Sequence, residues 1–234
     1  MNDFKTSGLV DSALINKITN LVLRQLKNYW DDVDENIIAA NVPEALKAME
    51  ENFYGLPNKR FFDGVKAVFN PVMSIHWMIF LYRLSNVIYK NWEGTAKEAD
   101  YCYYLNKIMH ANDWFYAINL PKHFLCEHPL GSVLGRATYG DYFFIYQGIT
   151  VGGNVSKGRT YYPIIGNNVI MLANSSILGE SKIGANVIVA TGACIVHENI
   201  PDNCIVFGRS PNLIIKEKSR EYMITLINEY GRWR

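Results

Sequence analysis

The sequence predicts an α+β fold, with an N-terminal helical domain followed by a β-helix of hexapeptide repeats and a short C-terminal tail. Two observations carry this prediction. Apolar side chains with helical spacing fill residues 1–115, and large apolar side chains recur every six residues from Val133 to about Ile200. We therefore expect a helical domain over residues 1–115, a β-helix over 116–208 and a tail over 209–234.

The helical domain is expected to contain five helices, because apolar residues recur there every three to four positions. Their expected bounds are Asp11 or Ser12 to near Trp30, from just after Asn41 to Gly55, and residues 60–69, 73–92 and 96 to about 114. Asp11 or Ser12 is a suitable N-cap, and Pro43 falls in the first turn of the second helix, where proline is tolerated. The high aromatic content of this region indicates packing of the helices on one another.

Residues 115–135 connect the helices to the first coil of the β-helix. Asn119, Pro121, Pro129 and Gly131 interrupt regular structure in this segment. It also contains His123 and His128, the only two of the five histidines that lie close together in the sequence.

The β-helix is predicted from large apolar anchors with a strict six-residue period and a single two-residue slip. The anchors are Val133, Tyr139, Ile145, Val151, Ile165, Met171, Ile177, Ile183, Val189 and Ile195. A second row, four residues further on, consists of Ala137, Phe143, Ile149, Val155, Val169, Ser175, Ser181, Val187, Ala193 and Asn199. Neither a helix nor an alternating strand has this period, whereas short strands in stacked coils do.

The slip falls within residues 152–163, so the chain is expected to leave the coil there as a loop. Such an excursion sacrifices stacking and is more often kept for a site than for stability. The side chains of Tyr142, Phe144 and Tyr146 alternate with the anchors, and we expect them to contribute to an interface between subunits.

Composition narrows the function classes. The chain has 23 basic and 22 acidic residues among 234, which gives no sign of binding to nucleic acid or to an anionic membrane. The N-terminus lacks a signal peptide pattern, and the longest apolar run, residues 77–81, is too short to span a bilayer. Four cysteines without a CxxC pair (Cys102, Cys126, Cys194 and Cys204) indicate reduced thiols and a cytoplasmic location.

Four segments resemble the hexapeptide-repeat acetyltransferases, and among these the serine acetyltransferases. They are HPLGSVLG from His128, GITVGG from Gly148, ILG from Ile177 and IPDNCIVFGRSP from Ile200. The resemblance covers about residues 69–216 and implies a left-handed parallel β-helix with acetyl-CoA as the acetyl donor. It also implies a homotrimer or a dimer of trimers, with active sites between neighbouring subunits.

The resemblance assigns roles to several residues. His128 falls on the catalytic base of the family, and Glu127 falls where an aspartate usually meets the acceptor. Gly152 and Gly153 fall on the glycine pair beside the thioester of acetyl-CoA. We further expect the pantetheine arm near Ala173 and Ala190, and the phosphates near Arg209, Lys216 and Lys218.

The acceptor half departs from the family pattern. Serine acetyltransferases carry Arg-His-Pro at the end of the loop, whereas this chain has Tyr161, Tyr162 and Pro163, with Arg159 two positions early. The aspartate that orients the catalytic histidine is also missing, because the matching position reads Asn119. We therefore expect Glu127, Arg159, Tyr161 and Tyr162 to bind an acceptor hydroxyl, on L-serine or on a sugar of a surface-polysaccharide precursor.

Direct acetyl transfer from a thioester needs a general base, which neutral histidine supplies, and N–H donors for the oxyanion. No metal is expected. Two alternatives remain open: a metalloenzyme of the γ-carbonic anhydrase kind that uses His123 and His128 with His110 or His197, and a non-catalytic β-helix scaffold.

Overall fold

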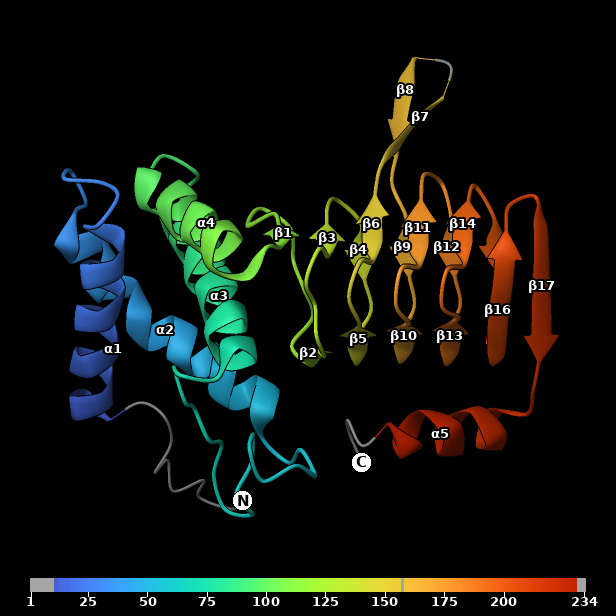
Figure 1. Ribbon diagram of the computed structural model, residues 1–234, viewed down its shortest axis with the longest axis horizontal. Helices are drawn as coiled ribbons and strands as arrows, with labels where there is room; N and C mark the ends of the chain where they lie inside the picture. Colours follow the sequence, from blue (N-terminus) through green and yellow to red (C-terminus); the bar gives the residue numbers. More distant parts are fainter. Residues whose placement is uncertain (1–10, 157, 231–234) are drawn as a thin grey trace. The chain divides into compact units, whose positions relative to one another are not determined.

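The computed structural model describes residues 11–156 and 158–230 (Figure 1). The chain forms two compact units, one up to Asn106 and the other from Lys107 onwards. The first unit is helical and the second is dominated by a parallel β-helix, which confirms the predicted fold class. The domain limits at 116 and 209 stay predictions. None of the described helices is long and apolar enough to cross a membrane.

Four helices precede the β-helix. They are α1 (Ser12–Leu26), α2 (Glu35–Phe53), α3 (Ser74–Asn91) and α4 (Lys97–His110). Asp11 caps α1 as expected, because its side chain accepts a hydrogen bond of 2.8 Å from the backbone N–H of Leu14. The second helix begins earlier than predicted, since Asp34 caps it through the N–H of Asn36, and Pro43 therefore lies inside the helix.

Two further predicted helix bounds and one predicted helix are also wrong. Residues 60–69 contain turns and an isolated bridge, because the Asp63 carboxylate accepts the backbone N–H groups of Val65 and Lys66 at 2.9 Å and closes a turn. The first helix ends at Leu26 rather than near Trp30. The last ends at His110 rather than near residue 114, because β1 (Asp113–Trp114) pairs with the β-helix.

His76 lies at the centre of an aromatic cluster in the helical unit. Its side chain is fully buried, its ring is 4.7 Å from that of Phe53 and 4.8 Å from that of Phe61, and its Nδ1 accepts the backbone N–H of Asn70 at 3.1 Å. Burial lowers the pKa of His76 from 6.5 to about 4. The ring is therefore neutral at pH 7.

Lowering the pH from 7 to 5 is expected to reduce the free energy of unfolding by about 2 kcal/mol through His76. The folded-state pKa of about 4 lies below the ordinary value of 6.5, so the unfolded chain binds this proton more readily. The stability that neutral, buried His76 contributes to the folded state is therefore complete above pH 6.5 and is lost as the pH falls toward 4. Urea unfolding at both pH values measures the effect. The control is His76→Asn, which keeps an acceptor for Asn70 but does not titrate; an equal pH effect in both proteins would contradict the assignment.

The β-helix has three faces of parallel strands (Figure 1). Face A consists of β2 (Phe124–Cys126), β5 (Phe143–Ile145), β10 (Val169–Met171), β13 (Val187–Val189) and β16 (Cys204–Arg209). Face B consists of β1, β3 (Val133–Leu134), β6 (Thr150–Gly152), β11 (Ser176–Leu178) and β14 (Cys194–Val196). Face C consists of β4 (Thr138–Tyr139), β9 (Ile164–Ile165), β12 (Lys182–Ile183) and β15 (Asn199–Ile200).

The strand register confirms the hexapeptide period. Met171 pairs with Val189, which follows it in the sequence by one coil of three hexapeptides. Nine of the ten anchors are buried, but Val133 is 37% exposed, because Leu134 is the residue that pairs with Val151 and points inward. In the second row, Val155 and Asn199 are exposed rather than buried.

A hairpin explains the slip in the period. Strands β7 (Asn154–Ser156) and β8 (Arg159–Tyr161) pair only with each other among the described strands and project from the coil (Figure 1). Ile145 consequently pairs with Met171, so the coil that joins them is longer than the regular coil from Met171 to Val189. The predicted loop therefore contains two paired strands, β7 and β8.

Three edges join the faces, and each is a column of stacked corners. The A–B edge consists of residues 127–132, 146–149, 172–175 and 190–193. The B–C edge consists of residues 135–137, 153–156, 158–163, 179–181 and 197–198. The C–A edge consists of residues 140–142, 166–168, 184–186 and 201–203. On the C–A edge, the left-handed residues Asn168, Asn186 and Asn203 form a ladder of side-chain hydrogen bonds of 2.8 Å.

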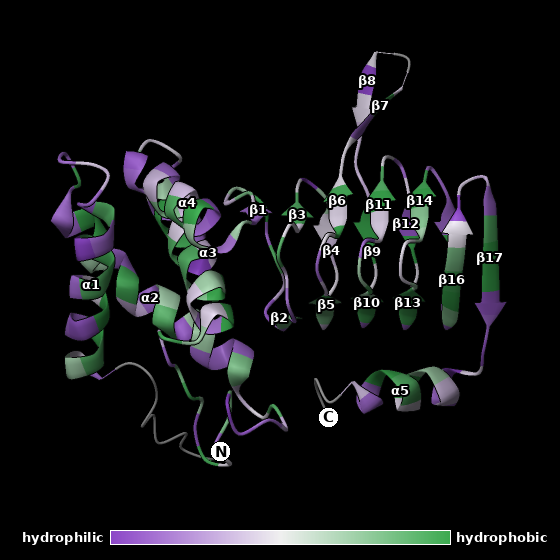
Figure 2. Cartoon of the chain, in the orientation of Figure 1, coloured by the Kyte–Doolittle hydropathy of each residue, from purple (hydrophilic) through white to green (hydrophobic). Residues whose placement is uncertain are grey.

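The expected C-terminal tail contains regular structure. Strand β17 (Asn212–Glu217) pairs antiparallel with β16, and α5 (Arg220–Glu229) follows. The outward residue Ile188 of face A is buried, as are Met223 and Ile227 of α5. The strands β5, β10 and β13 of face A are hydrophobic (Figure 2). Phe144 also points outward and is fully buried within the chain, so the expectation that it contributes to a subunit interface is wrong.

Candidate active site

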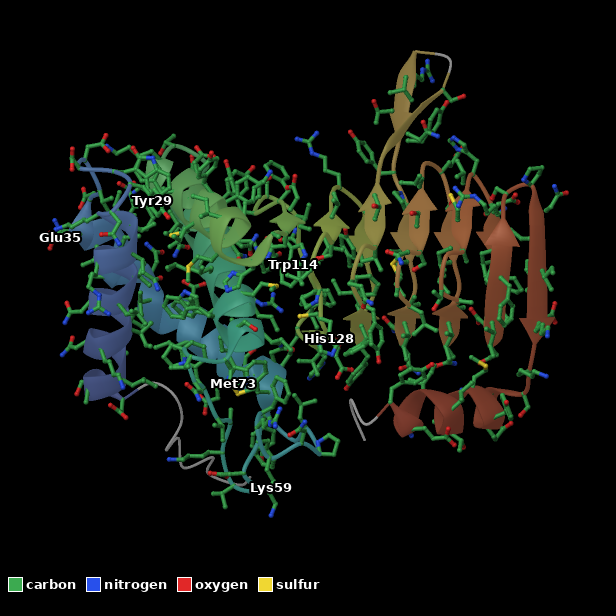
Figure 3. All side chains as sticks on the ribbon, in the orientation of Figure 1. Tyr29, Glu35, Lys59, Met73, Trp114 and His128 are labelled. Atoms are coloured by element: carbon green, nitrogen blue, oxygen red, sulfur yellow. The ribbon has the colours of Figure 1, made fainter. Side chains whose placement is uncertain are left out.

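His128 lies on the A–B edge, directly after β2 (Figure 3). Its side chain is exposed and its backbone is left-handed, with φ of 49°. Backbone hydrogen bonds fix this corner. The N–H of Leu130 donates to the carbonyl of His128 at 2.8 Å, and the N–H of Gly148, in the next coil, donates to the carbonyl of Leu130 at 2.8 Å. The fold thus presents the imidazole at a rigid corner.

A carboxylate binds His123 rather than His128. His123 lies at the other end of β2, where its Nδ1 is 2.7 Å from the carboxylate of Asp141. Its backbone N–H donates to the same carboxylate at 2.9 Å. Its ring stacks on Tyr142, with 4.5 Å between the ring centres. Burial raises the pKa of Asp141, but the hydrogen bonds from His123 outweigh it and leave that pKa below its usual value. Among the described residues, none hydrogen bonds to the ring of His128.

The histidines do not form a metal site. His123 and His128 lie at the two ends of β2 on different edges, at most about 16 Å apart, the span of five fully extended residues, and His197 lies on the third edge. The described part of the chain contains no group of three His, Cys, Asp or Glu side chains that could hold a metal ion. The described residues of one chain therefore do not supply a ligand set for the γ-carbonic anhydrase alternative.

The glycine pair and the hairpin meet on the B–C edge. A Cβ built on Gly152 would have no atom within 4 Å, whereas one on Gly153 would lie 2.8 Å from the ring of Tyr162 and 2.9 Å from Thr160. The Tyr162 ring therefore packs directly over Gly153, with the side chain still 40% exposed. Two parts of the expected site, the glycine pair and Tyr162, lie together.

The other two residues expected to bind the acceptor, Tyr161 and Arg159, lie at opposite ends of β8. Tyr161 is at the base of the hairpin, opposite Asn154, while Arg159 is exposed at the far end of β8. The ring of Tyr161 meets that of His197 edge-on, with 6.2 Å between the ring centres. Neither Arg159 nor Tyr161 lies on the edge that carries Glu127 and His128.

The residues expected to bind acetyl-CoA lie at several separate places on the β-helix. Ala173 and Ala190 lie on the A–B edge with His128, and the carbonyl of Ala173 accepts the N–H of Gly192 at 2.9 Å. Arg209 lies at the end of β16, where it pairs with Cys194 of face B. The Lys216 Nζ atom is 5.2 Å from the centre of the Phe207 ring. The backbone N–H of Lys218 donates to Asn203, so Lys218 lies toward the C–A edge, away from Ala173 and Ala190.

Comparison with known proteins finds relatives of this chain among serine acetyltransferases. No family model matches the chain. The serine acetyltransferase of Synechococcus elongatus is 35% identical over 95 residues, and that of Staphylococcus epidermidis is 37% identical over 100 residues. These stretches are 40% and 42% of this chain and 38% and 46% of the relatives, so the chain spans less than half the length of the curated relatives it matches.

Solved structures agree in fold. The serine acetyltransferases of Neisseria gonorrhoeae and Vibrio cholerae superpose on this chain with TM-scores of 0.66 and 0.67. They cover 89% and 90% of this chain and 82% and 83% of their own length, at 20% and 18% identity, so this likeness concerns the fold alone. The chain is similar to serine acetyltransferases in sequence and in fold. The resemblance inferred from the sequence motifs is thereby confirmed.

The residues expected to form the two halves of the site lie on two edges of one chain. His128, Ala173 and Ala190 are on the A–B edge, whereas Gly153 and Tyr162 are on the B–C edge. The three-residue strands of face B separate the edges by about 10 Å, and the hairpin projects on the side of the β-helix opposite to His128 (Figures 1 and 3). One chain alone does not bring the expected base to the hairpin.

His197 is a residue of this region that the sequence analysis considered only as a metal ligand. It lies on the B–C edge in contact with Tyr161, and its ring also covers Gly179. The signal was present in the sequence, because His197 follows Gly179 by the length of one regular coil. Residues at that separation stack on one another in a β-helix.

Proposed function

We propose that this protein is an acetyl-CoA-dependent O-acetyltransferase that transfers acetyl to a hydroxyl group of a small acceptor. The observation that carries the proposal is the exposed His128 at a rigid corner, on the same edge as the small residues Ala173 and Ala190. The similarity to curated serine acetyltransferases supports the reaction class. Their name makes L-serine the first acceptor to test.

In this mechanism His128 removes the proton of the acceptor hydroxyl as its oxygen attacks the thioester carbon. The carbonyl oxygen becomes an oxyanion, which backbone N–H groups near Gly152 and Gly153 stabilise. The space beside Gly152 is open, so a ligand can approach the backbone closely there. Collapse of the tetrahedral intermediate breaks the carbon–sulfur bond, and the proton held by His128 passes to the departing thiolate of CoA.

The site is completed by a second copy of the chain in this proposal. Because His128 and the hairpin lie on different edges of one β-helix, we infer that His128 of one subunit faces Gly153 and Tyr162 of its neighbour. A homotrimer of parallel β-helices, alone or as a dimer of trimers, satisfies this arrangement three times by symmetry. The protein should accordingly have at least a trimeric mass by light scattering.

A sugar hydroxyl is the second candidate acceptor. The Tyr162 ring covers Gly153 at the position where serine acetyltransferases have a histidine, and a flat ring suits stacking on a sugar better than binding a carboxylate. The deciding experiment is an acceptor screen with acetyl-CoA and L-serine, nucleotide sugars or reducing sugars, with free CoA as the readout. The proposal is wrong if no acceptor releases CoA and CoA does not stabilise the protein against heat.

Tyr162→Phe is expected to raise the KM for the acceptor roughly two- to tenfold, the contribution of one hydrogen bond, with a smaller effect on kcat. The reason is that phenylalanine keeps the ring over Gly153 and removes only the hydroxyl group. Steady-state kinetics with the acceptor found in the screen measure both constants. Tyr104→Phe, at an exposed tyrosine of the helical unit, is the matched control. Unchanged kinetics in Tyr162→Phe, with serine as the preferred acceptor, would remove Tyr162 from the acceptor pocket.

A further inference from the structure

His197 is held in a defined orientation on the B–C edge. Its backbone is left-handed, with φ of 57°, and its ring lies directly over Gly179, since a Cβ on that glycine would be 2.5 Å from the His197 Cε1 atom. The backbone N–H of Glu180 donates to the Nδ1 atom of His197 at 3.1 Å. Because Nδ1 accepts a hydrogen bond, the proton of the neutral ring is on Nε2. The ring is thus fixed although it is exposed.

The fixed ring supports the base of the hairpin. The Tyr161 ring of β8 meets it edge-on at 82°, with 6.2 Å between the ring centres. A two-stranded hairpin has little stability of its own, and β7 and β8 pair with no other described strand. The orientation of the hairpin therefore depends on contacts near its base, among them Tyr162 and Thr160 on Gly153 and Tyr161 on His197.

We propose that His197 is a positioning residue that holds the hairpin through Tyr161 and thereby sets the affinity for the acceptor. This inference rests on the proposed acetyltransferase function, in which the hairpin forms the acceptor side of the site. The contact of His197 is with the hairpin base, which carries the expected acceptor residues, and His197 lies on a different edge from Ala173 and Ala190, where the pantetheine arm is expected.

Hydrogen exchange of the unliganded protein tests the positioning without any assay of activity. The variant is His197→Asn, because asparagine tolerates a left-handed backbone and its side-chain oxygen retains an acceptor for the N–H of Glu180. Backbone amides of β7 and β8 are expected to exchange roughly two- to tenfold faster, the factor that an edge-on aromatic contact is worth. Gly179→Ala, which displaces the ring and also strains a backbone with φ of 65°, should do the same, whereas Tyr161→Phe, which keeps the ring contact, should retain wild-type exchange. Unchanged exchange in both His197→Asn and Gly179→Ala overturns the proposal.

Kinetics test the consequence for the acceptor. His197→Asn is expected to raise the KM for the acceptor by a similar factor, roughly two- to tenfold, and to leave the KM for acetyl-CoA unchanged. Lys182→Ala, an exposed substitution on face C, is the control. A change in the KM for acetyl-CoA alone, or in neither constant, overturns the role on the acceptor side. If the wild-type protein transfers acetyl to no acceptor, the proposed function fails, while the exchange experiment still decides whether His197 holds the hairpin.

Discussion

Gly166→Ala is expected to destabilise the protein by about 3 kcal/mol or more, or to prevent soluble expression. Gly166 lies on the C–A edge, where its backbone stacks on the next coil. A Cβ at this position would lie 2.8 Å from the carbonyl carbon and oxygen of Gly184, and backbone atoms cannot rotate away as a side chain does. Gly140 and Gly184 have similarly close backbone neighbours, so this column of glycines sets the spacing of the coils.

Urea unfolding of the full chain measures this effect, with Gly152→Ala as the matched control for stability. Gly152 is also at the end of a coil strand, but a Cβ there would have no atom within 4 Å, so we expect a change of under about 0.5 kcal/mol. A wild-type unfolding midpoint for Gly166→Ala would contradict the close stacking of the coils at this edge.

The β-helix could be predicted because its core repeats along the sequence. The nine anchors from Tyr139 onwards are buried against the same kind of side chain in neighbouring coils, so they carry the same signal. The error at Val133 arises where the period is locally broken. Leu134 and Val151 are paired although their separation in the sequence is one position short of a regular coil, and a strict count of six therefore selects the wrong neighbour.

Other errors arise where a single polar side chain decides the local structure. The carboxylate of Asp34 starts α2 earlier than the proline pattern suggested, and the carboxylate of Asp63 closes a turn within a segment of helical composition. The sequence predicts only a tail for the C-terminal segment, because strand β17 does not continue the six-residue period. It pairs antiparallel with β16 instead, a tertiary preference that a repeat pattern does not contain.

The division of the site between two edges follows from the same period. Gly152 follows His128 by one full coil and one further hexapeptide, so Gly152 lies one face further around the β-helix. His197 follows Gly179 by one full coil and therefore stacks on it. The contact of Tyr161 with His197 could not be predicted in this way, because the hairpin leaves the repeat and its direction depends on side-chain packing.

His128→Asn is expected to lower kcat by roughly 10² to 10⁴, the usual contribution of a general base, with little change in the affinity for acetyl-CoA. Asparagine tolerates the left-handed backbone at this corner, where φ is 49°, and the backbone hydrogen bond to Leu130 does not involve the side chain. The corner should therefore keep its shape while the base is lost. Release of free CoA at saturating acceptor and a thermal shift with CoA measure the two quantities.

His123→Asn is the matched control, because His123 is the histidine that a carboxylate orients in this chain, through Asp141 at 2.7 Å. If His123→Asn abolishes turnover and His128→Asn does not, the base has been assigned to the wrong end of β2. Mixing subunits then tests the shared site. Because the proposed site takes His128 from one copy and Gly153 from the next, oligomers mixed from His128→Asn and an inactive variant at Gly153 should regain part of the wild-type rate. No recovery in mixed oligomers would place the whole site within one chain, which the separation of the two edges argues against.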